Sequence, residues 1–86
     1  MELLHKEIEN CFPMIKKQFT RKSLSEFKNT HIFDLWRYHC GLGIWIRNNL
    51  LYSKESLLYN LFLDNDIEYI DEMSSFIIKM FYDSLL

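Results

Sequence analysis

The chain has 86 residues, of which 49% are hydrophobic and 16% aromatic, and its formal net charge is −2. This composition excludes a disordered chain, and the length suffices for one hydrophobic core but not for two domains. Two Gly and one Pro are too few for an all-β fold with many tight turns, and the apolar runs are far shorter than the roughly 20 residues that span a bilayer.

The first predicted helix covers residues 2–12. Apolar side chains recur there at helical spacing, with charged residues on the opposite side. Pro13 lacks the backbone N–H that a helix interior needs, although it suits the first turn of a new helix. We therefore expect the chain to break or kink near residues 12–13.

A short second helix is predicted over residues 24–29. Ser23 and Glu26 stand three residues apart, as the two members of a capping box do. Asn29 and Thr30 would close this helix, and the Thr30 hydroxyl would cap the next one.

Residues 31–51 form the most hydrophobic segment and are predicted to be the central helix of the fold. Apolar side chains occur on nearly all sides of this helix, which is typical of a buried helix or a partner interface. Gly41 and Gly43 are unfavourable in a helix by about 1 kcal/mol each relative to Ala, so their presence indicates a close backbone approach. The alternative is a break at Gly41–Gly43 that gives two helices.

Two further helices complete the prediction. Ser53 would cap a helix over residues 54–64, and Asn65 would end it in a left-handed conformation. Asp71 would cap the last helix, whose apolar residues recur at intervals of three, four, seven and eight. The sequence thus predicts an all-α fold, a single helical domain over residues 1–86 with four or five helices around the 31–51 helix.

The two signs of charge are segregated along the chain. Residues 1–54 hold nine basic and five acidic side chains, whereas residues 55–86 hold one basic and seven acidic ones. The sequence pI of about 5.9 argues against nucleic-acid binding as the main role. The candidate basic patch comprises Lys16, Lys17, Arg21, Lys22 and Lys28, and the candidate acidic patch comprises Asp64, Asp66 and Glu68.

No motif for a nucleotide, a metal ion or a catalytic centre is recognisable, so we expect no cofactor and no enzymatic activity. The alternating carboxylates of the acidic patch match a calcium-binding loop poorly. Cys11 and Cys40 are too few for a disulfide-rich secreted domain, and the charged N-terminal segment lacks a signal-peptide core. We expect both cysteines to be reduced, as in a cytoplasmic protein, and to be small residues of the core.

Arg47 lies eight residues after His39, which places it one step around the predicted helix from His39. His39 is predicted to be a core or half-buried histidine. A half-buried Arg47 needs an acceptor, and Asp71 or Glu72 at the start of the last helix are the natural candidates. We predict a clamp between helices at this point. The candidate interaction or clamp residues are His39, Trp45, Arg47, Asn48, Asp71 and Glu72.

The stretch from Arg37 to Leu50, followed by Asp71-Glu-Met-Ser-Ser75, resembles the domain-of-unknown-function family DUF6794 over roughly residues 37–86. The family pattern reads His-Phe-Gly-Leu-Gly-x-Trp-Ile-Arg-Asn, then Asp-Asp-Met-Ser. Cys40 replaces the usual aromatic residue and Glu72 the second Asp. The resemblance implies an α-helical fold and a bacterial or phage origin, and it supplies no activity. The matching residues are His39, Gly41, Leu42, Gly43, Trp45, Ile46, Arg47, Asn48, Asp71, Met73 and Ser74.

The small size, segregated charge and surplus of aromatic residues favour a non-enzymatic module that binds a larger protein. Within this class the prediction is a bacterial or phage inhibitor or immunity protein, directed against a toxin, a nuclease or a CRISPR complex. Two alternatives stay open. The basic patch would serve a nucleic-acid-associated regulator, and exposed apolar surface would serve a structural homodimer. No membrane association is expected.

Overall fold

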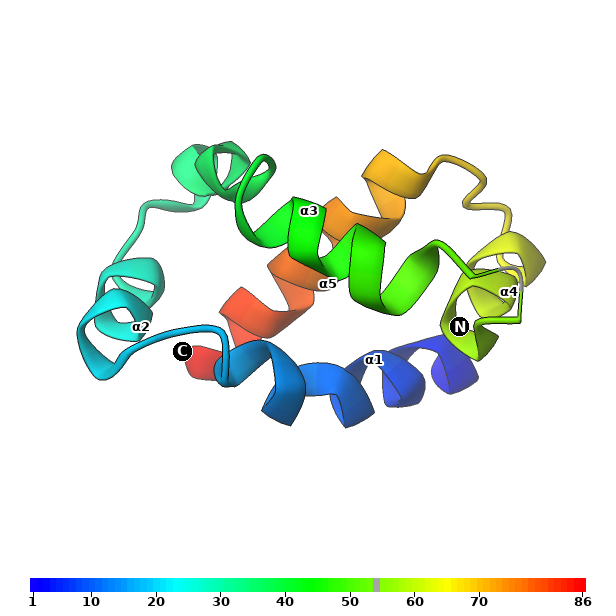
Figure 1. The fold of residues 1–86 in the computed structure, drawn as a ribbon, viewed down its shortest axis with the longest axis horizontal. Helices are drawn as coiled ribbons and strands as arrows, with labels where there is room; N and C mark the ends of the chain where they lie inside the picture. Colours follow the sequence, from blue (N-terminus) through cyan, green and yellow to red (C-terminus); the bar gives the residue numbers. More distant parts are fainter. Residues whose placement is uncertain (54) are drawn as a thin grey trace.

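A computed structural model describes residues 1–53 and 55–86, and all regular elements in these ranges are helical (Figure 1). This confirms the predicted all-α fold. Five α-helices, a 3₁₀ helix (η1) and a π-helical turn (η2) follow one another along the described chain. Their bounds are α1 Glu2–Lys16, α2 Arg21–Lys28, η1 Ile32–Tyr38, α3 Leu42–Ile46, η2 Arg47–Leu51, α4 Leu57–Asp64 and α5 Ile70–Leu85.

Helix α5 is the centre of the fold. It packs against α1, α2, η1, α3 and η2, and its Phe76 ring meets Phe62 of α4 edge-on, with 5.6 Å between centroids. Figure 1 shows α5 crossing behind α3, with α1 running along the lower edge of the view. The regular apolar spacing of α5 explains this position, because it gives one continuous buried stripe. Its buried residues are Met73, Ser74, Ile77, Ile78, Phe81 and Tyr82.

The prediction of one central helix over residues 31–51 is wrong. The segment forms η1, a turn at residues 39–41, and then α3 running directly into η2. No residue of η1 is fully buried. The apolar side chains of 31–51 are spread around the helix axis, so a single straight helix could not have buried them all in so small a protein. The alternative of a break that gives two helices is closer, but the break lies at residues 39–41, and Gly43 is inside α3.

Helix α1 continues through Pro13, contrary to the predicted break. Leu4, Ile8, Cys11 and Ile15 are all buried, so one stripe faces the core on both sides of the proline. The Pro13 ring is exposed, and its carbonyl still accepts a hydrogen bond from the Lys17 N–H at 3.2 Å. Packing of the continuous stripe outweighs the one hydrogen bond that the proline removes.

The predicted start of α2 is displaced by three residues. Thr20, not Ser23, caps the helix, and its hydroxyl accepts a hydrogen bond from the Ser23 N–H at 3.0 Å. The Ser23 hydroxyl in turn accepts one from the Thr20 N–H at 2.8 Å. Ser23 is therefore the third helical residue of the capping box, the position predicted for Glu26. The next cap is likewise displaced, because the His31 side chain caps η1 and Thr30 does not.

The remaining caps also differ from prediction. Ser56, not Ser53, caps α4, and the predicted first residue of that helix, position 54, lies outside the described residues. Asn65 is not left-handed (φ −106°), and the left-handed residue is Asp66, at φ 64°. Asp71 lies inside α5, which begins after Tyr69. Several cap-forming residues stand near each boundary, so residue type alone did not select the right one.

The segregated charges occupy opposite ends of an elongated molecule measuring 35 × 23 × 23 Å. The basic patch lies on the end of α1 and on α2, whereas the acidic patch lies at the end of α4 and in the connection to α5. Figure 1 shows these two regions at the two ends of the long axis. All eight side chains are exposed. Among the described helices, none combines the length and hydropathy required to cross a bilayer.

Candidate functional site

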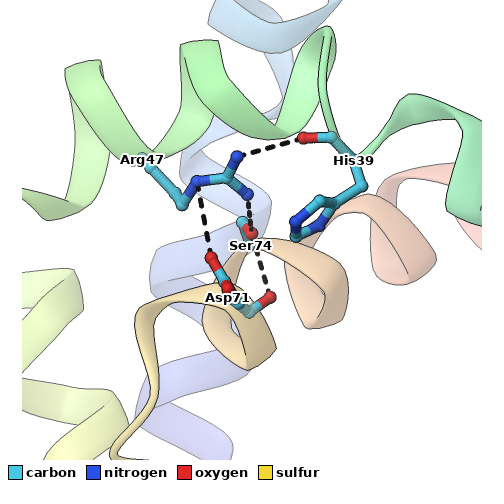
Figure 2. A network of polar contacts seen from close by, with 4 residues as sticks. All are labelled: His39, Arg47, Asp71 and Ser74. Carbon is cyan, nitrogen blue, oxygen red and sulfur yellow. Dashed lines mark hydrogen bonds and ion pairs between the residues drawn. The ribbon is translucent and has the colours of Figure 1, made fainter.

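Arg47 is the buried charged residue at the junction of α3, η2 and α5, with only 7% of its surface exposed. Its Nη1 donates a hydrogen bond to the Ser74 hydroxyl at 2.9 Å, and its Nη2 donates one to the His39 carbonyl at 3.1 Å. Its Nε lies 3.7 Å from Oδ1 of Asp71. Figure 2 shows the guanidinium between these three partners. One side chain thus ties η2 to the first turns of α5 and to the turn after η1.

A glycine in the preceding helical turn leaves room for the Arg47 guanidinium. Gly43 lies one helical turn before Arg47, and a Cβ at Gly43 would come within 3.0 Å of Arg47 Nη1 and 3.4 Å of the Tyr38 carbonyl. The missing side chain therefore provides the space for the guanidinium. A Cβ at Gly41 would meet nothing within 4 Å, so the close approach inferred from the two glycines holds for Gly43 alone.

Ser74 fixes the α5 side of the cluster. Its hydroxyl accepts a hydrogen bond from Arg47 and donates one to the Asp71 carbonyl at 3.0 Å, so it serves as acceptor and donor at once (Figure 2). The Asp71 side chain is 70% exposed, which leaves its carboxylate well solvated. Buried arginine needs acceptors on several sides, and here a hydroxyl, a carbonyl and a carboxylate supply them. The arrangement fastens helices together.

The structure brings together three of the six candidate residues, and it leaves the other three apart. His39 contributes its backbone carbonyl to the cluster, and its side chain lines a hollow between η1 and α5. Trp45 is half-buried beside Phe19 and Tyr38, in a different hollow. Asn48 and Glu72 are exposed and line two further hollows. A role for any of the six in binding a partner stays a prediction.

The two cysteines differ in environment, and both are free thiols. Cys11 is buried in α1, and this burial, together with the neighbouring Glu7 carboxylate, raises the pKa of its thiol. Cys40 is exposed, so its prediction as a core residue is wrong. Residues 39–41 form the turn between η1 and α3, which carries Cys40 to the surface. Within residues 1–53 and 55–86, no three His, Cys, Asp or Glu residues lie close enough to share a metal ion.

Sequence reasoning missed the exposure of two aromatic residues in η1. Phe33 and Trp36 of η1 are 81% and 70% exposed, although the 31–51 segment was expected in the core. Ser74 was quoted only as part of the family pattern, and its bond to Arg47 was not foreseen. Its position offered a signal, because a serine at the place of a core residue in an apolar stripe needs a polar partner.

These observations define a small all-α protein in which a buried arginine joins its middle segment to its C-terminal helix. The chain belongs to the family described as Domain of unknown function (DUF6794), whose model matches residues 6–85. The match extends well beyond the resemblance seen over residues 37–86 and includes α2 and most of α1. No curated protein and no solved structure matches the chain.

Proposed function

We propose that this protein is a non-enzymatic module that binds a larger protein through η1. The observation that supports the proposal is the exposure of Ile32, Phe33 and Trp36, whose surfaces are 43%, 81% and 70% accessible. They stand on a seven-residue helix without one buried residue. Large exposed aromatic residues are typical anchors of protein interfaces, because a partner gains most from burying them.

The surroundings of these side chains suit an interface. A hollow of about 280 Å³ lies between η1 and α5, with Leu35, Trp36 and Ile78 among its lining residues. An apolar side chain of the partner would enter this hollow while Phe33 and Trp36 pack around it. The protein would then offer both a protruding aromatic surface and an adjoining depression.

Within this class we favour a small bacterial or phage inhibitor or immunity protein that acts in the cytoplasm. A compact helical protein with an exposed aromatic anchor can inhibit a larger one by covering its surface, with no chemistry of its own. A toxin, a nuclease or a CRISPR complex is the kind of target we propose.

Affinity capture from the host lysate tests the proposal. The tagged protein should retain a stoichiometric protein partner that survives nuclease treatment, and Phe33→Ser/Trp36→Ser should lose it. Leu3→Ser is the matched control, because Leu3 is 72% exposed but lies on α1, outside η1. Loss of the partner in the control but not in the η1 variant would contradict the proposed surface. Capture of only its own copies would favour a homodimer instead.

A nucleic-acid-associated regulator is the second candidate, supported by the position of the basic patch. Its five exposed cations lie at the end of the molecule opposite the acidic patch. Contact with phosphates there predicts binding to duplex DNA that weakens steeply with salt. Lys17→Glu/Lys22→Glu should abolish that binding, while Lys6→Glu, an exposed cation outside the patch, should have little effect. Absence of binding at low salt would eliminate this candidate.

A further inference from the structure

A second hollow, of about 380 Å³, lies at the acidic end of the molecule where η2, α4 and α5 meet. Three of the five tyrosines of the chain line it, namely Tyr52, Tyr59 and Tyr69. Among the residues that the structure describes, none lines both this hollow and the hollow beside η1. A site here would therefore be independent of the proposed η1 interface.

The tyrosines around this hollow remain accessible. Tyr69 is 71% exposed, Tyr52 is 60% exposed, and Tyr59 is half-buried. Leu51, which is buried, and Ile70, which is half-buried, supply apolar lining between them. The result is an open apolar depression bordered by aromatic residues, at the small end of the range of roughly 300–1,000 Å³ for ligand sites.

The charge among the described lining residues of the hollow is negative. Glu68 is exposed and is one of its lining residues. Asp64 and Asp66 precede it on the end of α4 and in the following turn, and residues 55–86 carry seven acidic side chains against one basic one. An anionic ligand would be repelled here, whereas a cation would be attracted.

Aromatic side chains and a carboxylate around one hollow favour a particular kind of cation. Ammonium, quaternary ammonium and guanidinium groups are attracted to the negative face of an aromatic ring and also shed water more readily than metal ions. A metal ion would need several carboxylate, imidazole or thiolate ligands, and the described residues offer no group of three. We propose that the hollow lined by Tyr52, Tyr59, Tyr69 and Glu68 binds an organic cation. The cation belongs to a small molecule or to a Lys or Arg side chain of another protein.

A pair of ligands of the same shape provides the direct test. Choline and 3,3-dimethylbutan-1-ol differ in the positive charge, so a hydrophobic depression would bind them equally. In a titration followed by NMR of the tyrosine rings, choline should bind in the millimolar range with shifts confined to the three tyrosines. The neutral alcohol should bind at least about five-fold more weakly, a difference that one ring–cation contact supplies. Equal binding, or no shift with choline and with the peptides below, would overturn the proposal.

Variants separate the contributions of ring and carboxylate. Tyr69→Leu should weaken choline binding about five-fold and Tyr69→Phe should preserve it, because Phe keeps the ring. Glu68→Gln should also weaken it and should reduce its sensitivity to salt. Trp36→Leu is the matched control, since Trp36 is 70% exposed but belongs to η1. An equal loss in Trp36→Leu would show general adsorption to aromatic residues and would refute the site.

Two further probes identify the source of the cation. The tripeptides Gly-Lys-Gly and Gly-Arg-Gly, with blocked ends, carry the protein-borne cations. Tighter binding of either peptide than of choline would assign the hollow to a partner's side chain, and the reverse order would assign it to a small molecule. Either order supports a cation site, provided that the peptide Gly-Gln-Gly fails to bind. Binding of Gly-Gln-Gly as tight as that of the charged peptides would contradict it.

Discussion

Helices η1 and α5 are both rich in large apolar residues, yet they have opposite places in the molecule. No residue of η1 is fully buried, whereas six residues of α5 are. Their hydrophobic content does not separate them, but their periodicity does. Residues of α5 that are three, four and seven apart share one face. In η1, residues three apart lie above one another, so Ile32 and Leu35 form one row and the exposed Phe33 and Trp36 form a second row on another side. Burial in so small a protein is therefore decided by the arrangement of apolar residues more than by their number.

Removing one phenylalanine from each helix gives the largest expected contrast. Phe81 is 2% exposed and meets the rings of Phe12, Phe19 and Phe27 at centroid distances of 5.5 to 6.0 Å. Phe81→Ala should lower the free energy of unfolding by about 3–5 kcal/mol, because it leaves a cavity among these rings. Phe33→Ala should change it by less than about 0.5 kcal/mol. Urea denaturation measures both, and comparable losses would contradict the contrast.

Arg47→Met tests the connection between α5 and the segment before it. The variant removes a buried cation and leaves the Ser74 hydroxyl and the His39 carbonyl short of a partner. We expect a loss of about 2–4 kcal/mol in stability to urea, mainly from these two hydrogen bonds, because the exposed Asp71 carboxylate is screened by water. Arg37→Met, at an exposed arginine of η1, should change stability by under about 0.5 kcal/mol. Unchanged stability of Arg47→Met would refute the clamp.

The two glycines sharpen the same comparison with a smaller effect. A methyl group at Gly43 meets the guanidinium of Arg47, which its three partners hold in place. Alanine normally raises helix stability by about 1 kcal/mol relative to glycine. Gly43→Ala should not raise the stability of the wild-type protein, but it should raise that of the Arg47→Met variant by about this amount. Gly41→Ala should behave alike in both backgrounds. A double-mutant cycle by urea denaturation measures the coupling, and a coupling of zero would contradict the close approach.

The two cysteines are expected to have the smallest effect on stability. Iodoacetamide should modify Cys40 in the native protein and reach Cys11 only after unfolding, as mass spectrometry can show. The pKa of Cys11 is raised in the folded state, first by burial and then by Glu7. Folding therefore favours the neutral thiol, which stabilises the folded protein. This stabilisation is fully present below the ordinary pKa of a thiol and is lost as the pH rises through the raised pKa of Cys11. Cys11→Ala should remove this alkaline decline, and an unchanged decline would contradict it.

The sequence predicted the helical fold and the last helix well, because a regular apolar stripe is a strong local signal. It also pointed to Asp71 or Glu72 as the acceptor for Arg47, since a half-buried guanidinium on an apolar face requires one, and the structure pairs Arg47 with Asp71. Both inferences rest on properties that do not depend on the rest of the structure.

The helix boundaries and the hollows could not be predicted, because they depend on contacts between segments that are distant in the sequence or on several similar residues at one boundary. Thr20 and Ser23 are both good caps, and residue type alone does not decide which of them begins the helix; in the structure Thr20 does. Pro13 is tolerated because a buried stripe continues past it. The hollow lined by Tyr52, Tyr59 and Tyr69 joins residues from three elements, so no local pattern could reveal it.

The separation of charge along the long axis has a consequence for how the molecule meets a partner. The Debye length at physiological ionic strength is about 8 Å, much shorter than the 35 Å length of the protein. An approaching molecule therefore senses the end nearest to it and hardly senses the other. The net charge of −2 and the acidic pI describe neither end. At physiological salt the basic end and the acidic end therefore act as two separate charged surfaces. An anionic partner is attracted to the basic end, and a cationic partner is attracted to the acidic end.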